Sequence, residues 1–295
     1  MRAHLVLPSL LLLGSLSATA ACSSGSSGTA SSTTAGARPG SSATVSPVRS
    51  VDPSKIKGLQ LVNDNSESTS CAWATSYPDV PGASAMTAAM KKYVEGRLAT
   101  FRSACQGDRR ELNISHQFLV ASGDVLGVRL STQDGSGAGN GLSRRTYWYD
   151  GKAGGYRTAL ALVADGSRDA FVTTLKNQLK GREGTDTDTL NEAFADRSDL
   201  TSVLDDMAFT ADGGLRVIFQ AGAVGAVPAG SYLVTLSKET VAPWLSAFGR
   251  RAQQQTVQPS RSLDLGATST PTAAAPTHMA SGDDDTDCKR SAASP

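Results

Sequence analysis

The chain has 295 residues, with 28 basic and 27 acidic side chains and a formal net charge of +1. A surface that binds nucleic acid usually carries a strong basic excess, so this balance argues against a nucleic-acid partner. Runs of Ser, Thr, Ala and Gly dominate both ends of the sequence. The central part, roughly 200 residues, is long enough for a single hydrophobic core.

The N-terminus has the pattern of a secretory signal. A positively charged start, Met1–His4, precedes an apolar stretch from Leu5 to Leu16. This stretch is too short to cross a bilayer, which takes about 20 helical residues. Small residues follow it, as in signal peptides that are removed after export. We therefore expect residues 1–21 to be cleaved.

Two cleavage patterns compete at the end of this signal. Ala18-Thr19-Ala20 fits ordinary signal peptidase, which would leave a secreted chain. Thr19-Ala20-Ala21-Cys22 resembles a bacterial lipobox, although Thr19 replaces the usual Leu. In a lipobox the cysteine is acylated, with chains such as palmitate, and becomes the first residue. The Ser/Gly-rich stretch 23–28 is typical of a tether behind a lipid anchor. We expect Cys22 to hold the protein on the outer face of the cell membrane.

Composition also predicts the domain boundaries. Residues 22–50 and 253–295 contain few apolar side chains and cannot offset the entropy of ordering, so we expect disordered tails there. The domain should span residues 51–252. The lipobox is bacterial, and the Ala/Gly-rich usage is typical of a high-GC actinobacterium.

The central region alternates between strand and helix patterns. A stripe of apolar residues every three or four positions predicts a long helix over Ser84–Cys105. Ser122-Gly123-Asp124 is a hairpin turn signal, and Ser167 and Ser237 are candidate helix caps. Alternating or β-branched runs predict strands at 56–62, 71–77, 112–121, 125–132, 143–149, 207–210, 215–219 and 231–236. The expected fold is α+β, an antiparallel sheet packed with one long and several shorter helices.

The four cysteines contain no Cys-x-x-Cys pair, which argues against a zinc ribbon or a thioredoxin-type site. In an exported protein Cys71 and Cys105 form a plausible disulfide; two buried thiols are the alternative. If Cys22 carries lipid, Cys288 is left without an assigned partner.

Motifs for catalysis are missing from the sequence. His116 is the only histidine within the predicted domain, and alternation places it beside Ile114 and Phe118, as for a half-buried structural residue. The sequence has no Gly-x-Ser-x-Gly elbow and no His-Glu-x-x-His helix. We therefore assign no catalytic residue, metal or cofactor.

Pairs of carboxylates leave one enzymatic alternative open. Asp205-Asp206 and the pair Asp186 and Asp188 would suit a hydrolase that modifies the cell wall. Helix caps and solvated faces explain such pairs more often. The Gly-rich stretch 134–141 lacks the strand–loop–helix context of a phosphate site and indicates a loop between two strands.

One cluster suggests a binding surface. Arg144 and Arg145 stand beside Tyr147 and Trp148, and Arg and aromatic residues are enriched at binding hot spots. Alternation sends Tyr147 and Trp148 to opposite faces of a strand, so half of this cluster belongs to the core.

The order of motifs is similar to that of a known family. The chain resembles the extracytoplasmic domain of RsiV-type anti-sigma factors, whose C-terminal part is catalogued as domain of unknown function 3298. The resemblance covers about residues 58–250 and rests on Tyr77-Pro78, Tyr147–Lys152, Phe209–Gly213, Leu215–Phe219, Pro228–Gly230 and Tyr232–Leu236. The family usually has a Tyr before the Pro-x-x-Gly-like stretch, where this sequence has Ala221–Ala226.

The resemblance implies binding and transfers no catalytic residue. RsiV-type domains bind lysozyme, but this sequence shows no cytoplasmic segment, so an anti-sigma role is not implied. We expect a non-catalytic envelope lipoprotein that binds an extracellular protein or peptidoglycan. The alternatives are the carboxylate-based hydrolase and a secreted structural or antigenic surface protein.

Overall fold

The computed structural model describes residues 46–66, 68, 70–105, 109–135, 141–196, 200–260 and 262–265. All of them belong to one unit of the chain, residues 44–295. Within these residues, two β-sheets and several helices form the α+β fold that the sequence predicts. Cys22 and Cys288, and with them the predicted signal peptide and most of the tails, lie outside the described residues.

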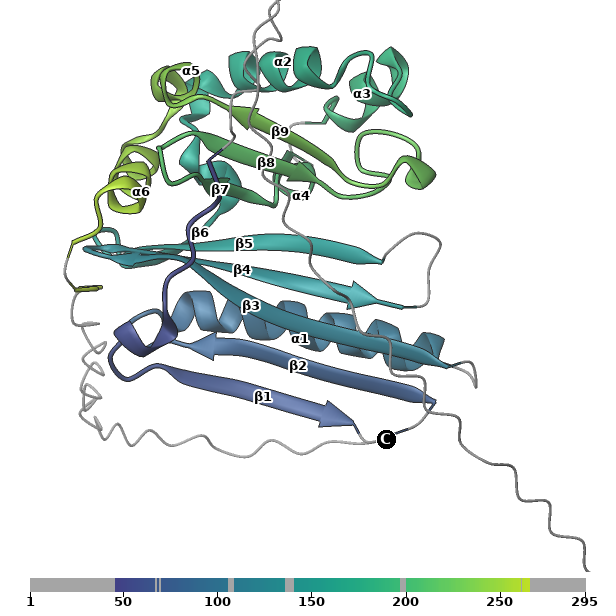
Figure 1. The fold of residues 1–295 in the computed structure, drawn as a ribbon, viewed down its shortest axis with the longest axis vertical. Coiled ribbons are helices and arrows are strands. Elements are labelled where there is room, and N and C mark those ends of the chain that lie inside the picture. Colours follow the sequence, from purple (N-terminus) through teal and green to yellow (C-terminus); the bar gives the residue numbers. More distant parts are fainter. Residues whose placement is uncertain are drawn as a thin grey trace, which may run out of the picture. The chain divides into compact units, whose positions relative to one another are not determined.

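The larger sheet has six strands, which lie side by side in chain order (Figure 1). All neighbouring pairs are antiparallel except β2 and β3. The predicted hairpin turn joins β3 to β4, and Gly123 takes a φ of 55° there, which glycine adopts readily. The strands are β1 (Gln60–Ser66), β2 (Cys71–Asp79), β3 (Arg110–Ser122), β4 (Val125–Asp134), β5 (Leu142–Asp150) and β6 (Gly155–Thr158).

A long helix, α1 (Ser84–Ala104), explains the parallel pair. It buries the predicted apolar stripe of Met86, Met90, Val94, Leu98 and Phe101. At about 1.5 Å per residue it is about 31 Å long. The helix carries the chain back along β2, so that β3 starts beside β2 and runs in the same direction. A tight turn would have given the antiparallel pairing expected from the sequence.

The second half of the domain builds a smaller antiparallel sheet of β7 (Met207–Phe209), β8 (Leu215–Phe219) and β9 (Tyr232–Leu236). Figure 1 shows α2 and α5 beyond this sheet, on the side away from β5. The helices that accompany it are α2 (Arg168–Leu179), α3 (Thr187–Ala193), α4 (Leu200–Val203), α5 (Lys238–Val241) and α6 (Ala247–Val257). Short 3-10 helices are η1 (Pro53–Lys55), η2 (Ala159–Leu162), η3 (Asp165–Ser167), η4 (Val227–Ala229) and η5 (Ala242–Trp244).

The six-stranded sheet separates two hydrophobic cores. On one face, Tyr147 and Tyr149 of β5 pack with the apolar stripe of α1. On the other face, Trp148 packs with residues of the smaller sheet and of α2 and α6. Alternation along one strand therefore supplies both cores. Trp148 lies over Gly127 of β4, where an added Cβ would come within 2.8 Å of the indole.

The folded part extends beyond the predicted boundaries at 51 and 252. At its start, the Ala211 amide donates to the Pro47 carbonyl at 3.0 Å, and Val48 forms an isolated β-bridge with Thr210. At its end, α6 continues to Val257, and Leu265 is buried. The predicted boundaries lie where the sequence becomes rich in polar residues. Residues just outside them are nevertheless part of the fold, because backbone hydrogen bonds hold residues 47–48 and α6 buries one face beyond residue 252.

Two local features differ from what the sequence predicts. The first is β6, a four-residue strand that follows the turn after Asp150 and carries no predictive pattern. The apolar residues Val241, Leu245 and Phe248 predict a single helix after Ser237, whereas in the structure Leu245 is extended and Ser246 caps a new helix, accepting a hydrogen bond from the Gly249 amide. Ser237 caps α5 as predicted. Ser167 makes no side-chain cap hydrogen bond at α2.

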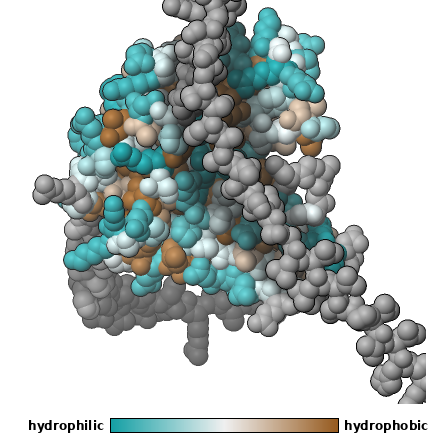
Figure 2. All heavy atoms as spheres, viewed as in Figure 1, coloured by the Kyte–Doolittle hydropathy of each residue, from teal (hydrophilic) through white to brown (hydrophobic). Residues whose placement is uncertain are grey.

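Among the described residues, no helix combines the length and apolar character needed to cross a membrane. Figure 2 shows hydrophobic residues in small groups among polar ones on the visible face. The exposed large hydrophobic side chains of the described residues are Leu61, Val62, Val227 and Leu233.

Candidate ligand-binding pocket

The aromatic half of the predicted binding cluster lies inside the domain. Trp148 has no exposed surface, and its ring contacts Phe209 and Phe248 edge-on, each with centroids 6.3 Å apart. Tyr147 is only 2% exposed and packs against Tyr156. A ligand at the surface would not reach either ring, so their role is packing.

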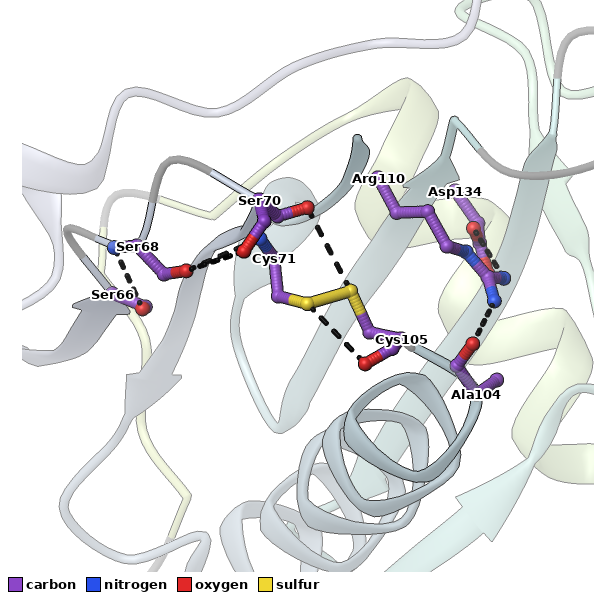
Figure 3. Close-up of a disulfide and its surroundings, with 8 residues drawn as sticks. All are labelled: Ser66, Ser68, Ser70, Cys71, Ala104, Cys105, Arg110 and Asp134. Atoms are coloured by element: carbon purple, nitrogen blue, oxygen red, sulfur yellow. Dashed lines mark hydrogen bonds and ion pairs between the residues drawn. A yellow bond between two sulfur atoms is a disulfide. The ribbon is translucent and has the colours of Figure 1, made fainter. Parts of the chain in front are cut away.

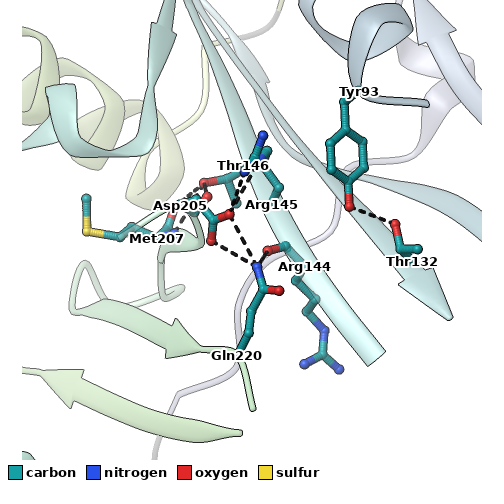
Figure 4. A network of polar contacts seen from close by, with 8 residues as sticks. All are labelled: Tyr93, Thr132, Arg144, Arg145, Thr146, Asp205, Met207 and Gln220. Atoms are coloured by element: carbon teal, nitrogen blue, oxygen red, sulfur yellow. Dashed lines mark hydrogen bonds and ion pairs between the residues drawn. The ribbon is translucent and has the colours of Figure 1, made fainter. Parts of the chain in front are cut away.

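The two arginines of the predicted cluster have different surroundings. The Arg144 side chain points away from Asp205 (Figure 4), and its carbonyl accepts a hydrogen bond from Gln220. The Arg145 guanidinium turns to Asp205, with its Nε and Nη2 each 3.1 Å from Oδ2 of that carboxylate. It also lies over the Tyr93 ring, 5.0 Å from the centroid. Arg145 thus lies beside the pocket described below, whose lining does not include Arg144, Tyr147 or Trp148.

The open edge of β5 brings Arg145 and Asp205 together. The short β6 pairs only with the stretch from Tyr147 to Asp150, which leaves the preceding part of β5 paired with β4 on one side and without a strand on the other. The segment before β7 takes that place: the Thr146 amide donates to the Asp205 carbonyl at 2.8 Å. The Thr146 hydroxyl adds contacts to the carbonyls of Asp205 and Met207. These bonds attach the second half of the domain to the first sheet.

A pocket of about 260 Å³ opens beside this junction. It lies between the end of β6, the start of η2, and α4. Hydroxyl-bearing side chains dominate its lining, which consists of Arg145, Thr146, Tyr156, Thr158, Ala159, Thr201, Ser202 and Asp205. The side chain of Arg145 remains 37% exposed, whereas that of Asp205 is 7% exposed. The pocket therefore presents one accessible cation above a recessed carboxylate.

The surroundings of Asp205 perturb its titration. Burial raises the pKa of Asp205 to about 6, against the opposing effects of Arg145 and Gln220. The Gln220 amide donates to both carboxylate oxygens at 3.2 Å. A recessed carboxyl group with a shifted pKa in a pocket is a common mark of a functional site.

The neighbouring Asp206 faces a different environment. Its side chain has no exposed surface, and its Oδ1 accepts from Arg129 Nε at 2.9 Å. Burial raises the pKa of Asp206, and Arg129 opposes that change. The two carboxylates of the Asp205-Asp206 pair thus bind different arginines, and only Asp205 lines the pocket.

The other candidates from the sequence lie away from this pocket. Asp186 caps α3, which lowers its pKa, and Asp188 is exposed in the first turn of that helix. His116 is half-buried, its Nδ1 is 3.1 Å from the Ser76 hydroxyl, and burial lowers its pKa. The Gly-rich stretch joins β4 to β5 as predicted, although residues 136–140 lie outside the described residues.

The predicted disulfide between Cys71 and Cys105 is confirmed, with Cα atoms 6.0 Å apart. It links the start of β2 to the residue after α1 (Figure 3). Arg110 donates to the Ala104 carbonyl at 2.8 Å and so satisfies the last turn of that helix. This region is structural.

A larger hollow of about 380 Å³ lies between residues 49–55 and 255–263. Its charged residues are less suited to a site: Asp52 and Lys55 are exposed, and Arg49 binds the Thr256 carbonyl. Within the described residues, no group of three or more His, Cys, Asp or Glu side chains could hold a metal ion. The smaller pocket has the more specific chemistry, because it contains a recessed ion pair.

Most residues of the pocket carry no signal in the sequence. Tyr156, Thr158, Thr201 and Gln220 are ordinary polar residues without a motif, and 60 positions separate Arg145 from Asp205. The arginine itself was found because it stands beside an aromatic run. Nothing in the local sequence distinguishes the remaining lining residues.

No protein-family model matches this sequence, and no curated protein is significantly similar to it. Solved structures that match part of this chain include two members of the family of domain of unknown function 3298. The one from Bacteroides fragilis is 10% identical with a TM-score of 0.44, over 68% of this chain and 99% of its own. The one from Pseudomonas aeruginosa PAO1 has the same identity and TM-score, over 65% of this chain and 97% of its own. At this identity and TM-score, neither a family nor a residue role is transferred from these structures to this chain.

Proposed function

We propose that this protein is a non-catalytic lipoprotein of an actinobacterial cell envelope that binds an extracellular ligand in the pocket beside Arg145 and Asp205. The pocket carries the proposal, because it combines a concave surface, an accessible guanidinium and a recessed carboxylate. An RsiV-type relationship, stated from the sequence motifs, is consistent with a binding role.

The geometry favours binding over hydrolysis. A glycosidase generally needs two carboxyl groups that flank the scissile bond, about 5–9.5 Å apart. Within the described lining of the pocket, Asp205 is the only carboxylate. Asp206 is fully buried against Arg129, and Asp186 belongs to a helix cap on α3. A structural or antigenic role without a ligand would not require a polar pocket of this kind.

The lipid at Cys22 supports placement at the cell surface. Twenty-four positions separate Cys22 from Ser46, the first described residue. Gly/Ser-rich linkers of about this length have an r.m.s. span of about 25–30 Å, enough to hold a domain clear of the membrane surface. We expect the mature N-terminus to be an acylated Cys22, as read by mass spectrometry of the purified protein.

The anchor is tested by fractionation. Cys22→Ala should move the protein from the membrane fraction to the medium, whereas the control Cys288→Ala should leave it on the membrane. An unmodified mature N-terminus at Ala21 would contradict the anchor and leave a secreted protein.

Ligand binding is tested with the full mature chain as bait in an envelope extract. Thr201 is exposed and lines the pocket, so Thr201→Trp should fill the pocket while both residues of the Arg145–Asp205 pair remain present. Arg157, exposed on β6 and outside the lining, provides the control Arg157→Ala. We expect retained material with the unaltered chain and with Arg157→Ala, and its loss with Thr201→Trp. Equal retention by all three proteins would refute the assignment of the pocket.

A further inference from the structure

The charge of the pocket restricts the class of its ligand. Arg145 and Asp205 are paired, and the other described lining residues are uncharged. The described lining therefore has no net charge when Asp205 is ionised. A phosphate or another strong anion would require an unpaired cation, and a cationic ligand would meet the exposed guanidinium of Arg145. The balance favours a neutral polar ligand.

Hydroxyl groups supply most of the polar lining. Tyr156, Thr158 and Thr201 each carry one that can donate and accept a hydrogen bond, whereas the Thr146 hydroxyl is already bonded to the backbone of Asp205 and Met207. Such hydroxyl groups are complementary to a ligand whose own polar groups both donate and accept hydrogen bonds. The hydroxyl groups of a sugar ring have this property.

The ion pair retains hydrogen-bonding capacity toward a ligand. Arg145 contacts Oδ2 of Asp205 through both Nε and Nη2, and the Gln220 amide is shared between Oδ1 and Oδ2. A carboxylate has about four acceptor positions, so Oδ1 can accept from a ligand hydroxyl. The guanidinium has five N–H donors and uses Nε and Nη2 on Asp205, which leaves donors for a ligand oxygen.

Size and shape agree with a small ring. Pockets for drug-sized ligands usually measure about 300–1,000 Å³, and this one, at about 260 Å³, lies just below that range. Tyr156 forms one wall with a half-buried ring that packs against Tyr147. A single ring bordered by an aromatic wall and hydroxyl groups fits this space.

We propose that the pocket beside Arg145 and Asp205 binds one uncharged sugar unit of an extracellular glycan. Asp205 Oδ1 accepts from a sugar hydroxyl, Arg145 donates to a sugar oxygen, and Tyr156 contributes its ring and its hydroxyl. This inference rests on the proposed function, because it identifies the ligand class for the same pocket.

The test measures binding of defined probes to the full mature chain by saturation-transfer NMR and calorimetry. The neutral probe is a chito-oligosaccharide of four N-acetylglucosamine units, and the anionic probe is glycerol phosphate. We expect saturable binding of the neutral probe and none of the anionic one. Tyr156→Phe removes one hydroxyl from the lining and should weaken binding about 3–10-fold. Thr201→Trp should abolish binding, and Arg157→Ala should leave it unchanged.

The outcomes separate this inference from the proposed function. If an envelope protein is captured in a Thr201-dependent manner while the saccharide does not bind, the sugar assignment is overturned and the binding function stands. Tighter binding of glycerol phosphate would overturn the neutral-ligand argument. Saccharide binding that Tyr156→Phe and Thr201→Trp leave unchanged would overturn its location in this pocket. If neither the saccharide nor any extract component binds, both proposals fail. Circular dichroism of each variant establishes that a loss of binding is not a loss of folding.

Discussion

The disulfide between Cys71 and Cys105 should contribute a large share of the stability of this domain. It joins residues 34 positions apart, so the closed loop contains β2 and α1. In the chain-entropy description, closing a loop of this length removes about 12.6 cal/mol/K from the unfolded state. At 25 °C this corresponds to about 3.8 kcal/mol, compared with about 5–15 kcal/mol for the total stability of a typical domain.

The measurement is urea unfolding followed by far-UV circular dichroism, with and without a reductant. A Cys288→Ser background prevents exchange with that third thiol. We expect reduction to lower the free energy of unfolding by about 3–4 kcal/mol. Cys71→Ala with Cys105→Ala should give nearly the same loss, since neither change should disturb the core beyond the two half-buried side chains.

A loss below about 1 kcal/mol would refute the loop-closure argument. It would mean that the reduced, unfolded chain already restricts this segment to a similar extent. A much larger loss, or failure of the reduced chain to fold, would show that the disulfide also holds native contacts in place. Cys288→Ser alone should leave the free energy of unfolding unchanged.

The remaining predictions concern the core, the pocket and two glycines. Trp148→Ala should destabilise the domain by about 3–5 kcal/mol, read by chemical unfolding, because it empties a fully buried site; a loss below 1 kcal/mol would contradict the packing role. Since burial raises the pKa of Asp205 from 3.8 to about 6, the folded state holds a proton there that the unfolded state has already released. The contribution of Asp205 to the free energy of unfolding therefore falls as the pH rises from about 4 to 6, by up to about 3 kcal/mol. The difference in free energy of unfolding between wild type and Asp205→Asn should change across that pH range. A difference that stays constant would argue against the shifted pKa. Gly249→Ala places a Cβ 2.0 Å from the Leu162 carbonyl oxygen and should cost about 1–3 kcal/mol, whereas Gly96→Ala has open space in α1 and should stabilise by up to about 1 kcal/mol. Equal effects of the two glycine changes would show that the close approach at Gly249 is not important.

Periodic patterns made much of the fold predictable. The stripe from Met86 to Phe101 identified α1, because a helix can bury one face only if apolar residues recur every three or four positions. The turn at Gly123 identified the β3–β4 hairpin for an equally local reason. β6 was not predicted because a run of four residues is too short to show a periodic pattern. The parallel pairing of β2 and β3 was not predicted because the direction of β3 relative to β2 depends on where α1 ends in space.

The candidate site was predictable only in part. Arg145 was found because it stands beside an aromatic run, but that run supplied two core residues, Tyr147 and Trp148. The carboxylate beside Arg145 is 60 positions away in the chain. Asp205 and Asp206 are adjacent in the sequence, which gives no reason to choose one of them as the residue that lines a pocket. In the structure both follow α4 and both pair with an arginine, so only the position of the pocket distinguishes them.

The sequence by itself determined the α+β class, the long helix and the pairing of Cys71 with Cys105 as a candidate disulfide. These features depend on local composition and short-range periodicity, and the export signal stays a prediction from the same kind of pattern. Only the tertiary structure decided which face each side chain takes and which distant residues meet. Asp205 and Arg145 line one pocket because the short β6 leaves the edge of β5 open, and the segment before β7 completes that edge. Contacts of this kind arise from how the two halves of the domain pack, and no local pattern encodes them.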